Sequence, residues 1–175
     1  MKIPILMVVV ISIAGALPSS AARRVFSDAE IATVVAAANQ GEIDAAVMAG
    51  SKASDAEVKG FAGHMSKAHE DAKRQLENVE KKAGLTPADS DVSSELKKQS
   101  TEESARLESL SGDEFDRAYM DAQVADHAAL LKKLDQDLIP SAKNPELAAL
   151  VRKLRPVVAG HLSKAKRIKG RLHPR

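Results

Sequence analysis

The sequence contains no cysteine and no tryptophan, and these absences exclude several classes of protein. Without a thiol, the chain has no disulfide, thiolate metal site, iron–sulfur cluster or cysteine nucleophile, and it carries no lipoprotein acylation site. Aromatic residues are almost missing too, since there are only three Phe and one Tyr. The core must therefore consist of Ala, Leu, Val, Ile and Met, which suits closely packed helices better than strands.

Sequence signatures of specific reactions are also missing. There is no Gly-rich phosphate loop, no dinucleotide fingerprint and no Gly-x-Ser-x-Gly elbow. The His69-Glu70 pair does not form a His-Glu-x-x-His zinc motif, because position 73 is Lys. The basic C-terminal segment has no interleaved aromatic residues that could stack on bases, so no nucleic-acid partner is expected.

The N-terminus has the pattern of a signal peptide. Lys2 precedes an apolar run over residues 3–17, and residues 18–22 are small or turn-forming. We predict cleavage after Ala22, because the run is shorter than the ~20 residues that a spanning helix needs. The alternative is a retained membrane anchor. The prediction gives a signal peptide over 1–22, one domain over 23–175 and a periplasmic or secreted protein without a lipobox cysteine.

Capping signals divide the rest of the chain into helices. Ser27, Ser54 and Ser111 each precede a Glu by three residues, which is the capping-box pattern. No stretch alternates with a period of two, so the predicted class is all-α. We expect a kink at Pro156, where a helical N–H is missing. The predicted helices cover residues 27–49, 54–83, 90–107, 111–139 and 145–172.

The helix over 90–107 is shorter and only weakly amphipathic. A short helix between the second and third long helices can carry the chain back along a bundle, as the crossover of ferritin-like folds does. We therefore expect a ferritin-like antiparallel four-helix bundle with an extra short crossover helix.

Each long helix places one ionisable group on its apolar face. Burying such groups is costly unless they are paired or metal-bound, so a group from each of four helices predicts a shared polar layer. The four groups are Glu42, His69, His127 and His161. Their possible neighbours are Asp116, Tyr119, Gln123 and Asp126.

Counting a rise of ~1.5 Å per residue from the bundle end divides this layer into two tiers. Glu42, Gln123 and His161 fall in one tier. The second tier holds His69 and His127, with Asp126 between the two tiers. One hypothesis is a transition-metal site for Fe, Mn or Zn, built from facing helices. The other is a hydrogen-bonded core, in which Glu42 pairs with protonated His161, and His69 with His127 or Asp126.

The order of these residues resembles a known family. The features are Gln-Gly-Glu-Ile at 40–43, Phe-Ala-x-x-Met-x-x-x-His at 61–69, Phe-Asp-x-x-Tyr at 115–119, then His127 and His161-Leu162 before a basic tail. With the signal peptide, they are similar to the bacterial domain-of-unknown-function family numbered 4142 over about residues 26–170. Its members are often labelled outer membrane or exported proteins.

The resemblance implies a ferritin-like fold but not a ferritin activity, because a fold does not fix a function. Di-iron proteins of that fold use Glu-x-x-His motifs. Here Ser66 stands three residues before His69, and Val158 three before His161. Ala68 replaces the Asp that the family usually has before His69. Ferroxidase or oxygenase chemistry is therefore not expected.

Three functions remain open at this stage. The first is a non-enzymatic structural or binding module whose polar core holds a metal ion. The second is a metal-dependent redox or oxidative-stress protein. The third is an envelope protein whose residues 164–175 contact an anionic surface, because residues 147–175 carry nine Lys and Arg and all 24 acidic residues precede them. Those basic residues also suit the negative end of a helix. A homo-oligomer is left open.

Overall fold

The computed structural model describes residues 24–172, and all of its regular structure is helical. The all-α prediction is confirmed for this part of the chain. The predicted signal peptide over 1–22 lies outside the described residues. The elements are α1 (Asp28–Lys52), α2 (Ala56–Ala83), α3 (Asp91–Glu108), α4 (Gly112–Lys133), the π-helical turn η1 (Leu134–Leu138), α5 (Ile139–Ser141) and α6 (Pro145–Leu172).

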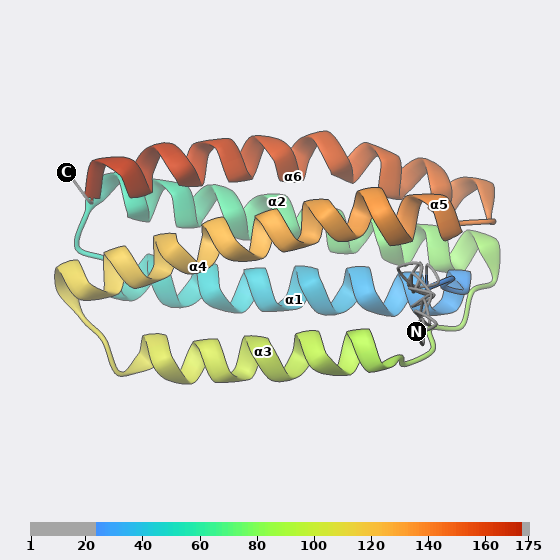
Figure 1. Ribbon diagram of the computed structural model, residues 1–175, viewed down its shortest axis with the longest axis horizontal. Coiled ribbons are helices and arrows are strands. Elements are labelled where there is room, and N and C mark those ends of the chain that lie inside the picture. The colour runs from blue at the N-terminus through green and yellow to red at the C-terminus, as the bar shows by residue number, and fades with distance from the viewer. Residues whose placement is uncertain (1–23, 173–175) are drawn as a thin grey trace, which may run out of the picture.

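Four long helices lie side by side, with α3 along the outside (Figure 1). The contacts run in a ring from α1 to α2, α6 and α4 and back to α1, and α3 packs mainly on α1. In Figure 1, α3 carries the chain back along the bundle, so α2 and α4 begin at the same end, where α1 and α6 finish. This arrangement decides which side chains meet in the core.

Helix α3 approaches α1 closely at a glycine. A Cβ atom added to Gly41 would lie 2.8 Å from Ser100 Oγ and 3.2 Å from Ser100 Cβ. A side chain at position 41 would therefore force Ser100 to move. Only Ser93 and Leu107 of α3 are buried, so this helix covers the bundle and adds one side chain, Leu107, to its core.

Several predicted helix ends are confirmed. Ser27 and Glu30 form the expected capping box, and Phe26 is buried in the same cluster as Ile31. Gly84, with φ of 62°, ends α2 in the left-handed conformation. Asn144 Oδ1 accepts hydrogen bonds from the first turn of α6.

Two predicted capping boxes are wrong. The N-cap of α2 is Asp55, one residue later than expected, because Asp116 binds the amide and hydroxyl of Ser54 and keeps it out of the helix. Ser111 is the N-cap of α4, but its side chain makes no capping hydrogen bond. Neither Ser54 nor Ser111 thus exchanges hydrogen bonds with the Glu three residues later. The end of α1 also differs from the prediction, since the helix continues through Gly50 to Lys52.

The chain between α4 and α6 stays helical past the predicted end. In η1 the helix widens, so that the N–H of Ile139 bonds to the carbonyl of Leu134, five residues back. This wider turn ends two residues before Pro140, whose ring does not fit the regular ladder. Helix α6 runs unbroken through Pro156.

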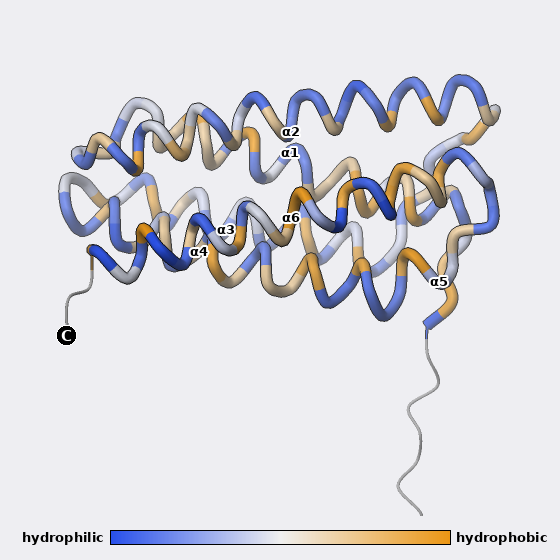
Figure 2. The backbone as a smooth tube through the Cα atoms, turned by 90° about the horizontal axis from the view of Figure 1, so that it is seen from above, coloured by the Kyte–Doolittle hydropathy of each residue, from blue (hydrophilic) through white to orange (hydrophobic). Residues whose placement is uncertain are grey.

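The apolar core forms two clusters along the bundle. One gathers around Phe61, Phe115 and Tyr119, and the other around Phe26, Leu76 and Leu147. Hydrophobic and hydrophilic residues alternate along each tube, as Figure 2 shows, which is the pattern of helices buried on one side. No helix in residues 24–172 is long and apolar enough to cross a membrane.

Candidate metal centre

Three histidines from three helices meet inside the bundle. His69 of α2, His127 of α4 and His161 of α6 are all buried, with at most 5% of each residue exposed. Their ring centroids lie 5.8 Å apart for His69 and His127, and 5.4 Å apart for each of the other two pairs. One ring nitrogen from each residue falls within 4.8 Å of the other two. No other group of three His, Asp or Glu residues in the described chain is this compact.

The prediction that His161 shares a tier with Glu42, apart from His69 and His127, is wrong. The rise per residue gives the level of the backbone atoms only, whereas side chains on a helix lean toward its N-terminus. Helix α6 runs opposite to α2 and α4 (Figure 1). His161 therefore leans toward the level of the other two histidines, and they lean toward His161.

Hydrogen bonds on the outer side fix two of the rings. His69 Nδ1 lies 2.9 Å from the Asn39 side-chain oxygen, and His127 Nδ1 lies 2.9 Å from the Gln123 backbone oxygen. Both partners are acceptors, so each Nδ1 carries the proton and each Nε2 keeps its lone pair. Three buried ring nitrogens have no hydrogen-bond partner: Nε2 of His69, Nε2 of His127 and Nδ1 of His161.

The environment keeps these imidazoles neutral. Burial, with a smaller effect of the neighbouring histidines, lowers the pKa of His69 to about 3. Burial likewise lowers the pKa of His127 to about 4 and that of His161 to about 4. Because neutral imidazole is the form that binds metal, protons do not compete for these nitrogens near neutral pH.

Glu42 lies behind His127 and outside the compact histidine group. Its Oε2 accepts a 2.7 Å hydrogen bond from Gln123 Nε2, and its Oε1 lies 3.4 Å from His127 Nδ1. Burial raises the pKa of Glu42 to about 8. The carboxyl thus contacts the ring nitrogen that faces away from the unpartnered Nε2. A hydrogen-bonding group behind a ligating histidine holds the orientation of its ring.

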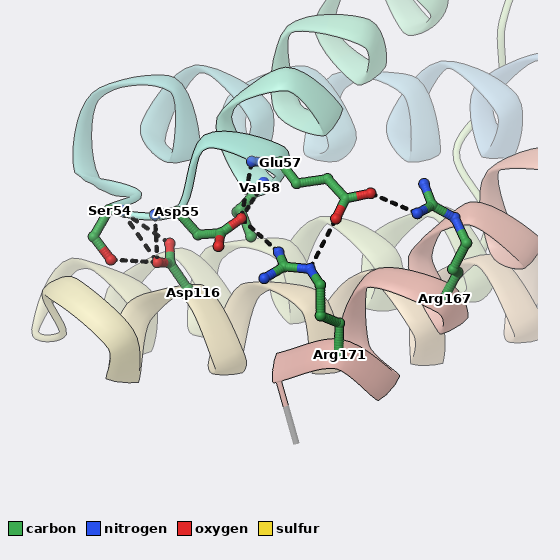
Figure 3. A network of polar contacts seen from close by, with 7 residues as sticks. All are labelled: Ser54, Asp55, Glu57, Val58, Asp116, Arg167 and Arg171. Atoms are coloured by element: carbon green, nitrogen blue, oxygen red, sulfur yellow. Dashed lines mark hydrogen bonds and ion pairs between the residues drawn. The ribbon is translucent and has the colours of Figure 1, made fainter. Parts of the chain in front are cut away.

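The remaining predicted neighbours have separate surroundings. Asp116 is buried at the start of α2, where it accepts hydrogen bonds from the Ser54 amide, the Ser54 hydroxyl and the Asp55 amide (Figure 3). Tyr119 is fully buried with an unpartnered hydroxyl, and burial raises its pKa well above the usual value. Asp126 shares a hydrogen bond with Glu103 of α3.

Sequence reasoning missed three residues near the centre. Asn39 holds His69, and it could have been found as a polar residue one turn before Glu42. His64 is exposed, and its ring lies 5.3 Å from that of His161. Glu103 gave no signal, because α3 is polar nearly all around.

Comparison with known proteins gives a family for the chain. The model of a family described as a domain of unknown function, DUF4142, matches residues 14–168. The chain belongs to this family. No curated protein and no solved structure matches it. The matched range includes His69, His127 and His161, and the match confirms the family resemblance seen in the sequence.

Neutral, buried and converging imidazole nitrogens can act as ligands to a cation. Three histidines with a free fourth position are a ligand set that proteins use for zinc. In a hydrogen-bonded core, these nitrogens would instead form hydrogen bonds with one another or with an acidic side chain. Such bonding is absent from the three unpartnered nitrogens named above.

Proposed function

We propose that this protein is a metal-binding helical bundle in which His69, His127 and His161 hold one transition-metal ion. The observation that carries the proposal is the set of three buried ring nitrogens without hydrogen-bond partners, one from each of three helices. Leaving a buried polar atom unpaired costs about 1–3 kcal/mol. A bound cation would satisfy all three atoms at once.

The ligand chemistry favours zinc among the metals that the sequence suggested. Fe and Mn sites in proteins usually include carboxylates, whereas this cluster offers nitrogen alone. Zn–N bonds of about 2.0–2.1 Å in a tetrahedral site place ligand nitrogens roughly 3.4 Å apart. In the present structure, the ligand nitrogens of the three histidines lie within 4.8 Å of one another. Small rotations of the rings would bring these nitrogens to the spacing that a zinc ion needs.

His64 marks the side from which an ion would enter. It is the exposed imidazole beside His161, on the same helix as His69. A fourth ligand is needed to complete a tetrahedral site, and water or His64 can supply it. Substituting His64 should therefore weaken binding less than substituting any of the three buried histidines.

We place this module in the cell envelope, as a periplasmic or secreted protein with a ferritin-like bundle. The support is the signal-peptide pattern of residues 1–22 and the return of the chain along α3. Its role there is binding or structural. The metal-dependent redox alternative has less support, since Ser66 and Val158 stand where a di-iron site has carboxylates.

Metal analysis of the purified protein tests this proposal. The protein is stripped with a chelator, loaded separately with Zn²⁺, Mn²⁺ and Fe²⁺, desalted and measured by plasma mass spectrometry. We expect about one Zn²⁺ per chain and a loss of roughly 100-fold or more in affinity for His127→Ala. The matched control is Lys67→Ala, an exposed change on the helix that carries His69, which should leave binding unchanged.

Two outcomes would overturn the proposal. One is a folded wild-type protein that retains no metal under any loading. The other is equal metal retention in His127→Ala, His161→Ala and the wild type. Circular dichroism on the same samples shows whether a variant that lost metal is still folded.

A further inference from the structure

A cavity lies between α1, α3 and α4, and its chemistry differs from that of the histidine cluster. Its volume is about 110 Å³, enough for a few water molecules or one small organic molecule. The walls are mostly apolar, with Ala37 and Ala45 from α1, Leu96 from α3, and Ala129 and Leu130 from α4. The cavity does not include any histidine among its lining residues.

One buried acceptor of this cavity has no hydrogen-bond donor. Gln123 lines the cavity and is fully buried; its Nε2 donates to Glu42, while its Oε1 has no hydrogen-bond partner. A buried amide oxygen left in this way requires a donor from a ligand or from water. The other acidic lining residues, Glu103 and Asp126, offer acceptors when ionised.

The charges around the cavity are unbalanced as well. Three carboxyls face it: Glu42, Glu103 and Asp126. The one cationic lining residue, Lys133, lies 3.7 Å from Asp137 outside the cavity. Burial and the neighbouring Asp126 together raise the pKa of Glu103 to about 7. Arg106 lowers that pKa, but its effect does not balance the others.

We propose that the cavity between α1, α3 and α4 binds a small alkylammonium ion. The ammonium group donates to Gln123 Oε1 and to the carboxylates of Glu103 and Asp126. The alkyl part packs on Ala37, Leu96 and the other apolar walls. This inference is independent of the metal proposal.

An organic cation fits better than a bare metal ion for two reasons. Among the described residues, the carboxyl oxygens around the cavity do not form a group of three within 4.8 Å, so they are too widely spaced for one compact ion. An inorganic ion would also leave the apolar walls without contact. A ligand with both a cationic head and an apolar body uses the whole cavity.

Binding can be measured by amide NMR on the metal-free protein at pH 8, where Glu103 is mostly ionised. The probe is n-butylammonium chloride, compared with 1-butanol as a neutral analogue and with NaCl at equal ionic strength. We expect butylammonium to shift the Gln123 side-chain amide and backbone amides that line the cavity. Butanol should bind roughly tenfold more weakly, as expected from losing one charge-assisted hydrogen bond.

Matched variants assign the binding to this cavity. Glu103→Gln should weaken butylammonium binding about tenfold, whereas Glu102→Gln, the same change at an exposed neighbour on α3, should not affect it. Ala37→Leu fills the cavity and should abolish binding. Thermal unfolding of each variant verifies that the fold is kept.

Several results would overturn this proposal. Equal binding of butanol would mean an apolar cavity without charge selection. Shifts of the same amides by CaCl₂ but not by butylammonium would mean an inorganic cation site. Unchanged binding in both Glu103→Gln and Ala37→Leu would place the ligand elsewhere, and no amide shifts at all would mean that the cavity binds no such ligand.

Discussion

Two polar regions of the bundle use their charged and polar groups in opposite ways. At the end where α2 begins, Asp116 accepts hydrogen bonds from Ser54 and Asp55, and Arg171 binds Asp55 and Glu57 (Figure 3). Nearly every polar group drawn there has a partner. In the middle of the bundle, three histidine nitrogens and one glutamine oxygen are buried without any partner.

The difference separates polar groups that hold the structure from polar groups that are open to a ligand. Paired groups at the bundle end fix the start of α2 and attach α4 and α6 to it. Unpaired groups in the middle reduce stability, so their presence indicates another use for them. The two regions should therefore respond differently to mutation, pH and salt.

The largest effect is expected at the bundle end. Asp116→Ala removes a buried carboxylate that accepts three hydrogen bonds, from the Ser54 amide, the Ser54 hydroxyl and the Asp55 amide. We expect a loss of about 4 kcal/mol in the free energy of unfolding, measured with urea. The control is Asp113→Asn at an exposed site in the first turn of α4. A loss of less than about 1 kcal/mol would mean that this network is not structural.

At Glu42, in the middle of the bundle, we expect the free energy of unfolding to depend on pH. Its pKa is raised to about 8 in the folded chain, above the ordinary value of 4.5. The folded state thus keeps a proton that the unfolded state has lost, so this contribution is complete below pH 4.5 and disappears as pH rises through 8. The loss is on the order of 3 kcal/mol at about 1.4 kcal/mol per pKa unit, less some solvent relaxation.

Glu42→Gln should remove that part of the pH dependence. Gln keeps an oxygen that can accept the hydrogen bond from Gln123, so the variant should be more stable than the wild type at pH 8 and similar at pH 4.5. Urea unfolding at several pH values measures the difference. Asp44→Asn, an exposed change on the same helix, is the control. If the wild-type and Glu42→Gln curves run parallel, Glu42 is not buried as described.

The sequence predicted which residues enter the core better than it predicted their contacts. Periodicity placed Glu42, His69, His127 and His161 on apolar faces, and all four are buried. The tier of His161 was wrong, because the lean of a side chain depends on helix direction. The partner of Asp116 was not predicted either, since its contact with Ser54 joins residues 62 positions apart. Periodicity describes one helix at a time, whereas such contacts depend on how two helices are placed.

In acid, we expect the buried histidines to lower the stability of the fold by an intermediate amount. The pKa of His161 is lowered from 6.5 to about 4, so the unfolded chain binds a proton in this range and the folded chain does not. The stability contribution is complete above pH 6.5 and is lost as pH falls through 4. His161→Leu should then be more stable than the wild type at pH 4.5, by on the order of 2 kcal/mol, without metal.

Near neutral pH, bound Zn²⁺ should make the wild type more stable than His161→Leu. With Zn²⁺ at 100 times its dissociation constant, the wild type gains about 2.7 kcal/mol and His161→Leu gains much less. Thermal unfolding with and without Zn²⁺ measures both. The same stabilisation in the variant would exclude His161 as a ligand and would remove the distinction between the two regions.

The smallest effect is expected at the ion pairs of Arg171. This side chain binds Asp55 at 2.7 Å and Glu57 at 2.8 Å, but it remains about half exposed. Exposed pairs contribute little and are screened by salt, so Arg171→Gln should cost less than about 1 kcal/mol, and less still in 1 M NaCl. Urea unfolding at two salt concentrations tests this, with Arg152→Gln on the same helix as the control.

The same ion pairs bear on the proposed contact with an anionic envelope surface. Arg167 and Arg171 bind acidic residues of α2, and Lys169 binds Asp121 of α4, so these basic residues of 164–175 already have partners. Each would have to exchange a protein carboxylate for a lipid. We therefore expect weak co-sedimentation with anionic vesicles, and an increase when Glu57→Gln frees Arg167 and leaves Arg171 with Asp55 as its one acidic partner. Strong binding that Glu57→Gln leaves unchanged would mean that these ion pairs do not compete with the membrane.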